Sequence, residues 1–296
     1  MQPAFSLPSF AKLNWTLRIL GKRGDGFHEL FTVFQTVSLH DSISFSAADE
    51  LSLTCDDLSV PTDERNLITQ AGIELQRRYG INAGAAIRLE KYIPSPGGLG
   101  GGSSNAAVAL IGLSQLWELS VSDDELHEIA VEIGSDVPFF LYGGTAVGTG
   151  RGEDIEQIPD AEEQNMLIVT PPVSVSTRDA FDRLTAPTLT FETLNRILPV
   201  CRSEAGSLDL RHSVLINDFE ASVFDAHPEI ERVKRTLLDF GAVNAAMSGS
   251  GASVFAIFDK PETRQTAIKA LDQESTWRKF AVATISRSQY REALRR

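Results

Sequence analysis

The sequence is poor in cysteine, in basic residues and in long apolar runs. Its two cysteines, Cys55 and Cys201, are far apart and fit no metal-ligand spacing, so we expect reduced thiols in a cytosolic protein. Lysine and arginine number 27 against 40 acidic residues, a formal net charge of −13, which argues against a nucleic-acid partner. No stretch approaches the ~18 apolar residues of a membrane helix, and the first residues lack a signal-peptide pattern. We therefore expect a cytoplasmic location and no membrane partner.

The rest of the composition is typical of a globular protein, with 42% hydrophobic and 23% charged residues. A length of 296 residues predicts two domains at ~150 residues per domain. Strand-like and helix-like segments are mixed without a regular alternation, which indicates an α+β fold. The acidic segment 154–164 separates two strand-like pieces. We place the boundary there, with domains 1–160 and 161–296.

Helix signals are clear at two places in the first half. Residues 66–79 predict a helix that Gly80 ends, and SDDELHEIAVEIG predicts another that Ser122 or Asp123 caps and Gly134 stops. The first stretch, residues 9–46, is strand-like. In the second half we expect helices over 176–184, 191–197, 218–226, 228–240 and 261–271, a strand–turn–strand unit at NAAMSGSGASVFAIF, and a last strand at FAVATIS.

Residues 94–105 read PSPGGLGGGSSN, which is either a flexible connection or a loop that holds phosphate. A strand-like segment, AAIRLEKYI, precedes it, and an apolar helix, AAVALIGLSQLWEL, follows with Ser103, Ser104 or Asn105 placed to cap its start. A strand, a glycine turn and a helix N-terminus together form an anion site. Because the overall charge is negative, a polyphosphate ligand would need local donors and a divalent cation.

Most known phosphate loops do not fit this stretch. A Walker loop needs Gly-Lys-Ser/Thr, but Ser103 and Ser104 follow Gly102 with no lysine. A dinucleotide fingerprint needs a third glycine that no placement supplies. The lysine and aspartate motifs of protein kinases are also absent from the sequence.

The remaining pattern resembles the second motif of the GHMP kinase superfamily. Two further stretches follow the family order, PSFAKLNWTLRILGKRGDGFHEL near the start and AAMSGSGASVFAIF, similar to the third glycine motif, near the end. IGSDVPFFLYGGTAVGTGRGE and LINDFE extend the resemblance over nearly the whole chain. It implies a two-domain fold, with an N-terminal ribosomal-protein-S5-like nucleotide domain and a C-terminal ferredoxin-like α/β domain.

The resemblance implies an ATP-dependent small-molecule kinase with ATP and Mg²⁺ as cofactors. Ser103 takes the Mg²⁺ role, through the ATP complex. The residues implied to surround ATP are Pro94, Ser95, Pro96, Gly97, Gly98, Leu99, Gly100, Gly101, Gly102, Ser103, Ser104 and Asn105.

The same resemblance implies that Asp136 is the catalytic carboxylate and that Lys12 orients it and the acceptor hydroxyl. From local sequence alone, Asp136 also fits a helix cap, since Pro138 follows it closely. Lys12 also fits a solvated residue on an edge strand. In a strand Lys12 and Asn14 share one face, so Asn14 is expected to bind the substrate.

The GDGFHEL turn resembles one branch of the superfamily, whose substrate carries a cytidyl diphosphate. That resemblance implies that the Phe27 ring stacks on the cytosine, that His28 supplies hydrogen bonds to it, and that Phe181 closes the other face of the base. An aromatic core anchor beside a surface histidine is the alternative interpretation of Phe27 and His28. A homoserine or mevalonate kinase, and a ligand-binding regulator without catalysis, also remain open. We expect a small-molecule cytidyl diphosphate substrate and a monomer or weak homodimer.

Overall fold

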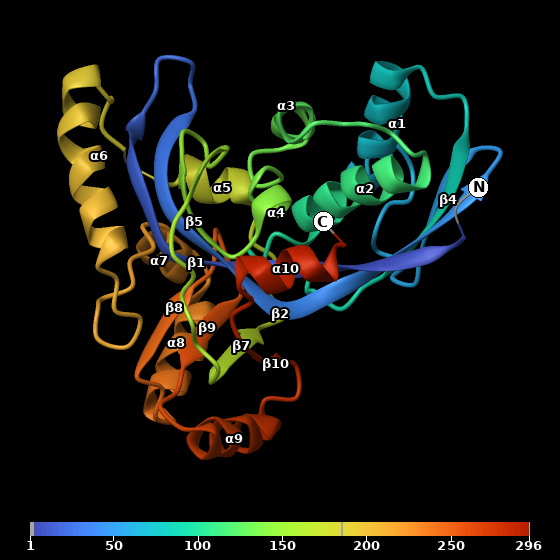
Figure 1. The fold of residues 1–296 in the computed structure, drawn as a ribbon. Helices are drawn as coiled ribbons and strands as arrows, with labels where there is room; N and C mark the ends of the chain where they lie inside the picture. The colour runs from blue at the N-terminus through green and yellow to red at the C-terminus, as the bar shows by residue number, and fades with distance from the viewer. Residues whose placement is uncertain (1–2, 185, 296) are drawn as a thin grey trace.

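The computed structural model describes residues 3–184 and 186–295 and contains two β-sheets with helices packed against each. Figure 1 shows the larger sheet with α1–α4 and α10 on one side, and the smaller sheet with α8 and α9 at the opposite end of the molecule. The strands of the larger sheet are β1 (Phe5–Lys22), β2 (His28–Ala48), β3 (Leu51–Cys55), β4 (Gly84–Glu90), β5 (Thr145–Thr149) and β6 (Asp154–Gln157).

The smaller sheet has the order β10-β7-β9-β8, and each neighbouring pair is antiparallel. Its strands are β7 (Met166–Thr170), β8 (Asn244–Met247), β9 (Val254–Ile257) and β10 (Arg278–Val282). The helices are α1 (Leu67–Tyr79), α2 (Gly101–Leu116), α3 (Asp123–Ile133), α4 (Phe139–Tyr142), α5 (Thr177–Asp182), α6 (Phe191–Gly206), α7 (Glu220–Ala226), α8 (Pro228–Asp239), α9 (Pro261–Ala270), a 3₁₀ turn (Leu271–Gln273) and α10 (Arg287–Ala293).

The long hairpin of β1 and β2 changes the face it buries along its length. The register shifts between Phe10 and Ala11, as expected for a β-bulge. Leu7, before the shift, packs in the core beneath the helices, while Ala11 and Leu13, which regular alternation would place on the same face as Leu7, pack in the core between the two sheets. The opposite face of this part of β1 carries Lys12 and Asn14, which the bulge turns toward the helical side.

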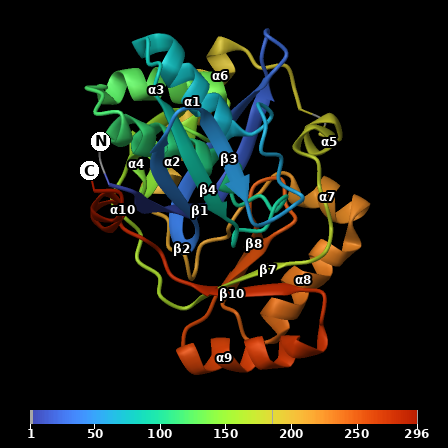
Figure 2. The same ribbon diagram turned by 90° about the vertical axis from the view of Figure 1, so that its right-hand side faces the viewer.

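Strands β7, β8 and β9 of the smaller sheet are buried on both faces, whereas β10 at its edge is partly exposed. In β7, Met166 and Ile168 pack against the larger sheet, while Leu167 and Val169 pack in a second core with α8. Figure 2 shows β7, β8 and β10 above α9, with α8 alongside them. Strands buried on both faces read as continuous apolar runs, as MLIV does here.

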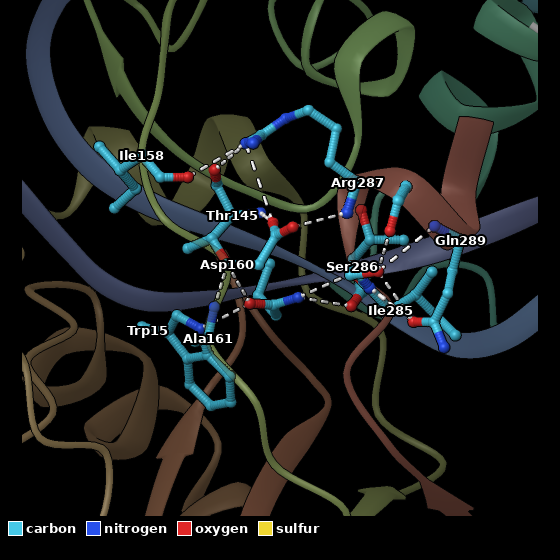
Figure 3. Close-up of polar contacts among 12 residues, drawn as sticks. Trp15, Thr145, Ile158, Asp160, Ala161, Ile285, Ser286, Arg287 and Gln289 are labelled. Carbon is cyan, nitrogen blue, oxygen red and sulfur yellow. Dashed lines mark hydrogen bonds and ion pairs between the residues drawn. The ribbon is translucent and has the colours of Figure 1, made fainter. Parts of the chain in front are cut away.

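The last helix returns to the first half of the chain. The Tyr290 hydroxyl donates to the Phe140 carbonyl at 2.6 Å, and Tyr290 is buried in the core of the helical layer. Figure 3 shows the contacts of the first residue of α10: the Arg287 N–H donates to the Asp160 carboxylate at 2.8 Å, and its guanidinium donates to the Thr145 carbonyl at 2.6 Å. The division into 1–160 and 161–296 stays a prediction, and α10 packs across it.

The structure confirms the α+β class and most predicted elements. Asn66 and Gly80 cap α1, and Ser122 caps α3 with a capping box. Three elements were missed, namely β3, β6 and α10, and α6 continues well past the predicted end at 197. Within the described residues, no helix is long and apolar enough to cross a membrane.

Candidate active site

A cleft of about 440 Å³ lies where the glycine loop, β1, the start of β2 and the SGSG turn meet. Its floor is formed by the predicted loop from Pro94 to Ser103. The rest of the lining comes mainly from β1, β2, the turn before α4, the turn after β5, α5, the residue before α7 and the SGSG turn. The side chains that these segments contribute include Lys12, Asn14, Thr32, Ser135, Asp136, Arg151, Thr177, Phe181, Phe219 and Ser250.

The glycine loop leads directly into α2, as predicted, but its serines do not cap that helix. Gly100 is the N-cap residue, with φ at 68°, and no side chain caps the helix. Ser103 therefore lies inside the first turn. The prediction of a serine or asparagine cap was wrong because Gly100, in the left-handed conformation, begins the helix three residues before Ser103, the first of the predicted caps. Without a cap, the first N–H groups of α2 are left for an anion.

The SGSG turn holds the glycine loop from behind. Ser248 donates its hydroxyl to the Gly98 carbonyl at 2.9 Å, and the Ser253 N–H donates to the Gly97 carbonyl at 3.1 Å. Gly98 has φ at 70°, and a Cβ there would lie 2.0 Å from the Ser248 carbonyl oxygen. The close approach of the two glycine motifs therefore requires a residue without a side chain.

The LINDFE stretch holds the SGSG turn in position through side-chain hydrogen bonds from Asn217. The buried Asn217 amide donates to the Met247 carbonyl at 2.7 Å and to the Gly249 carbonyl at 2.8 Å. Its own carbonyl oxygen accepts from the Phe219 N–H at 3.0 Å. Sequence reasoning did not assign a role to Asn217, although the LINDFE motif was the signal that marked it.

Two residues at the end of the predicted ATP loop are turned away from the cleft. The Ser9 hydroxyl donates to the Asn105 side-chain oxygen at 2.6 Å and lies within hydrogen-bond distance, 2.8 Å, of the Ser104 hydroxyl. All three side chains are buried. Ser104 and Asn105 therefore attach α2 to β1, and only the part of the loop up to Ser103 lines the cleft.

A buried lysine and a partly open carboxylate meet at one side of the cleft. The Lys12 side chain is 4% exposed and the Asp136 side chain 35% exposed, with 3.4 Å between the ammonium nitrogen and a carboxylate oxygen. Lys12 also donates to the Asn14 side-chain oxygen at 2.7 Å, and Asn14 donates to the Thr32 hydroxyl at 2.7 Å. This chain fixes the ammonium, while the carboxylate remains accessible to a ligand.

The alternatives drawn from local sequence do not describe these two residues. Lys12 is buried, so it is not a solvated edge lysine. Helix α4 begins at Phe139 with no side-chain cap hydrogen bond, so Asp136 does not cap it. Lys12, Asn14 and Asp136 lie together as predicted, and Thr32 joins them without any sequence signal that would have marked it.

The predicted cytosine residues lie beside the cleft in two pairs. The His28 ring stacks on Phe181, with 5.2 Å between ring centroids and 18° between planes. Burial lowers the pKa of His28 below its ordinary value, and nearby Lys22 acts in the same direction. Phe27 is 53% exposed, so it is not a core anchor. Its ring is covered by the guanidinium of Arg151, whose central carbon lies 5.0 Å from the ring centroid.

The contact between His28 and Phe181 bears on how a base would fit. The predicted arrangement places the base between the rings of Phe27 and Phe181, with His28 supplying hydrogen bonds. The stack of Phe181 on His28 holds the Phe181 ring beside the histidine, with 5.2 Å between the two centroids. The cover that Phe181 would give to the other face of the base stays a prediction.

Two family models match the chain, the GHMP kinases N terminal domain at residues 66–144 and the GHMP kinases C terminal domain at residues 201–275. The first includes the glycine loop and Asp136, and the second includes Asn217 and the SGSG turn. The fold and the site thus define an ATP-dependent small-molecule kinase of the GHMP class.

Individual proteins narrow the class further. The chain is 40% identical over 275 residues to the 4-diphosphocytidyl-2-C-methyl-D-erythritol kinase of Chlorobium phaeobacteroides, covering 91% of this chain and 92% of that one. A solved structure of 4-(cytidine 5′-diphospho)-2C-methyl-D-erythritol kinase is similar with a TM-score of 0.76 at 29% identity, covering 95% of this chain and 99% of that one. The chain belongs to the family of 4-diphosphocytidyl-2-C-methyl-D-erythritol kinases, within the GHMP kinases.

A homoserine kinase from Cytophaga hutchinsonii has a similar fold, with a TM-score of 0.70 over 97% of this chain and 96% of that one. Its identity of 22% supports a shared fold and nothing about a shared acceptor. The relatives at up to 40% identity confirm the predicted branch of the superfamily, read from the GDGFHEL turn.

Proposed function

We propose that this protein transfers the γ-phosphoryl group of ATP to the 2-hydroxyl of 4-diphosphocytidyl-2-C-methyl-D-erythritol. The products are the 2-phosphate and ADP, a step of non-mevalonate isoprenoid precursor biosynthesis. The observation that carries the kinase chemistry is the buried Lys12 ammonium 3.4 Å from the accessible Asp136 carboxylate, beside an uncapped helix N-terminus. The relatives at about two-fifths identity, with their printed names, support the choice of acceptor.

In this mechanism the protein acts mainly by positioning and charge, as phosphoryl transfer requires. The Asp136 carboxylate accepts a hydrogen bond from the acceptor hydroxyl and takes its proton as the new P–O bond forms. The Lys12 ammonium keeps Asp136 in place and balances its charge, because its other contact, to Asn14, fixes the ammonium. The first N–H groups of α2 face the transferring phosphate.

The residues present fit a divalent cation that is held mostly by phosphate. Ser103 lines the cleft in the first turn of α2, and its hydroxyl is an oxygen ligand of the kind Mg²⁺ prefers. Among the described residues, no group of three or more histidine, cysteine or carboxylate side chains forms a metal cage of its own. When bound, Mg²⁺ would neutralise charge on the phosphates, which the net charge of −13 makes necessary.

A variant of Asp136 tests the proposed chemistry. In Asp136→Asn the side chain keeps its shape but cannot take a proton, so ADP release with the cytidyl acceptor should fall by ~10²-fold or more. The affinity for ATP, measured by calorimetry, should change little, because Asp136 belongs to the turn before α4 and not to the glycine loop. Near-normal turnover in Asp136→Asn would remove this carboxylate from the mechanism.

We also propose that the enzyme works in the cytoplasm, as a monomer or weak homodimer, without a nucleic-acid or membrane partner. The negative net charge supports the first exclusion, because nucleic-acid binding rests on a basic face. Sedimentation at micromolar concentration would measure the oligomeric state.

A further inference from the structure

Three charged side chains line the described part of the cleft, Lys12, Asp136 and Arg151. Lys12 and Asp136 lie 3.4 Å apart, so their opposite charges largely cancel. Arg151 is then the cation left for a second negatively charged group in the cleft. Sequence reasoning assigned it no role, although it lies in the TGRGE stretch.

The turn after β5 holds the Arg151 guanidinium in one orientation. Both carboxylate oxygens of Glu153 contact Arg151: one accepts from its backbone N–H at 2.5 Å, and the other accepts from the side-chain Nε at 3.1 Å. The face of the guanidinium lies over Phe27. The two terminal amino groups, Nη1 and Nη2, have no hydrogen-bond partner among the described residues. A fork of donors held in this way is suited to a phosphate group.

Arg151 stands between the two ends of the proposed acceptor site. On one side, a Cβ on the neighbouring Gly152 would lie 3.8 Å from an Asp136 carboxylate oxygen. On the other side, the buried Glu29 accepts from the Gly150 N–H at 3.0 Å and from Arg23 at 3.1 Å, which fastens this turn to the one that carries Phe27. The guanidinium therefore lies between the phosphoryl-transfer centre and the proposed base subsite.

We propose that Arg151 binds the diphosphate of the acceptor substrate and thereby sets the distance between the base and the reacting hydroxyl. This inference rests on the proposed function, which places a base at one end of the acceptor and the hydroxyl at the other. Nearby cations are less suited. Arg23 is paired with Asp25 and Glu29, and Lys22 is exposed and outside the cleft lining.

The test compares cytidine 5′-diphosphate with cytidine, two probes that differ in the diphosphate alone. Their affinities are measured by calorimetry with ADP and Mg²⁺ at saturation, so that the nucleotide subsite is occupied. In Arg151→Gln the diphosphate probe should bind about 10- to 100-fold more weakly, because charge-assisted hydrogen bonds are lost. Cytidine affinity should change less than about twofold, and Arg151→Lys should recover part of the loss.

Steady-state kinetics supply the second readout. Arg151→Gln should raise KM for the acceptor in the same proportion and leave KM for ATP unchanged. Arg178→Gln is the matched control, since that guanidinium is 90% exposed on α5, pairs with Asp182 and does not line the cleft. It should change neither affinity.

The outcomes separate this inference from the proposed function. Equal weakening of both probes in Arg151→Gln would mean that the residue acts only by holding Phe27, and would overturn the inference. Unchanged affinities for both probes would overturn it as well. If the unaltered enzyme bound neither probe and did not phosphorylate the cytidyl acceptor, the proposed function itself would fail, and the inference with it.

Discussion

Gly98 is the point at which the two glycine motifs approach most closely, and replacing it tests whether that approach supports the site. In Gly98→Ala the new Cβ would lie 2.0 Å from the Ser248 carbonyl oxygen and 2.9 Å from the Gly251 carbonyl oxygen. Cβ atoms in proteins essentially never lie closer than about 3.0 Å to another heavy atom of this type, so the glycine loop or the SGSG turn must move by about 1 Å. Movement of the backbone is required because both opposing atoms belong to the main chain.

The cost of this change follows from its parts. An alanine at φ of 70° costs ~1–2 kcal/mol relative to glycine. Loss of the hydrogen bond from Ser248 to the Gly98 carbonyl adds ~1 kcal/mol. A loss of ~2–3 kcal/mol should lower Tm by roughly 5–10 °C. A displacement of ~1 Å in the phosphate loop should reduce kcat/KM for ATP by ~10²-fold.

Thermal unfolding followed by circular dichroism and an ADP-release assay measure the two effects. Gly206→Ala is the control, because a Cβ at the last residue of α6 meets nothing within 4 Å and φ there is not positive. Its Tm and activity should be unchanged or slightly raised. If Gly98→Ala behaved like Gly206→Ala in both assays, the inference that the contact between the two glycine motifs requires a glycine at position 98 would be refuted.

Two other predictions concern the polar side chains of the cleft. Lys12→Met should lower kcat by ~10²-fold or more, because the variant loses the cation that fixes Asp136. Its Tm should change little, because the lost ion pair is offset by the removal of a buried charge. A large fall in Tm with normal kcat would contradict this prediction. The pKa of His28 is lowered by burial and by Lys22, so the rise in KM for the acceptor that accompanies protonation of His28 should occur at lower pH than the ordinary titration of a histidine. Lys22→Met should raise the pKa of His28 and move that rise to higher pH, and NMR titration of the imidazole that showed no shift would contradict the assignment.

The parts of the fold that local patterns encode could be predicted from the sequence. Capping signals marked α1 and α3 correctly, because Asn66 and Ser122 satisfy helix N–H groups through their own neighbours. The edge strands β3 and β6 were not predicted, because pairing partners distant in sequence make short segments into strands. Helix α10 was not predicted either, because its position depends on the contact of Tyr290 with the Phe140 carbonyl, 150 residues away in the sequence.

The site shows the same division between local and distant information. Resemblance of motifs placed Lys12 beside Asp136, strand alternation placed Asn14 beside Lys12, and the structure brings the three side chains together. It did not indicate that Ser104 faces Ser9 instead of the cleft, because which side of α2 is buried depends on how β1 packs against it. Nor did it indicate Arg151, whose place is set by contacts with Glu153 and Phe27.

The most direct test of the central claim is a comparison of kcat/KM for 4-diphosphocytidyl-2-C-methyl-D-erythritol, homoserine and mevalonate. ADP release is followed with ATP and Mg²⁺ at saturation. A site built around hydrogen bonds to a base should reject acceptors that lack it by ~10⁴-fold or more. The account predicts turnover with the cytidyl acceptor at that margin over the other two. Comparable turnover with homoserine or mevalonate, or none with the cytidyl acceptor, would contradict it.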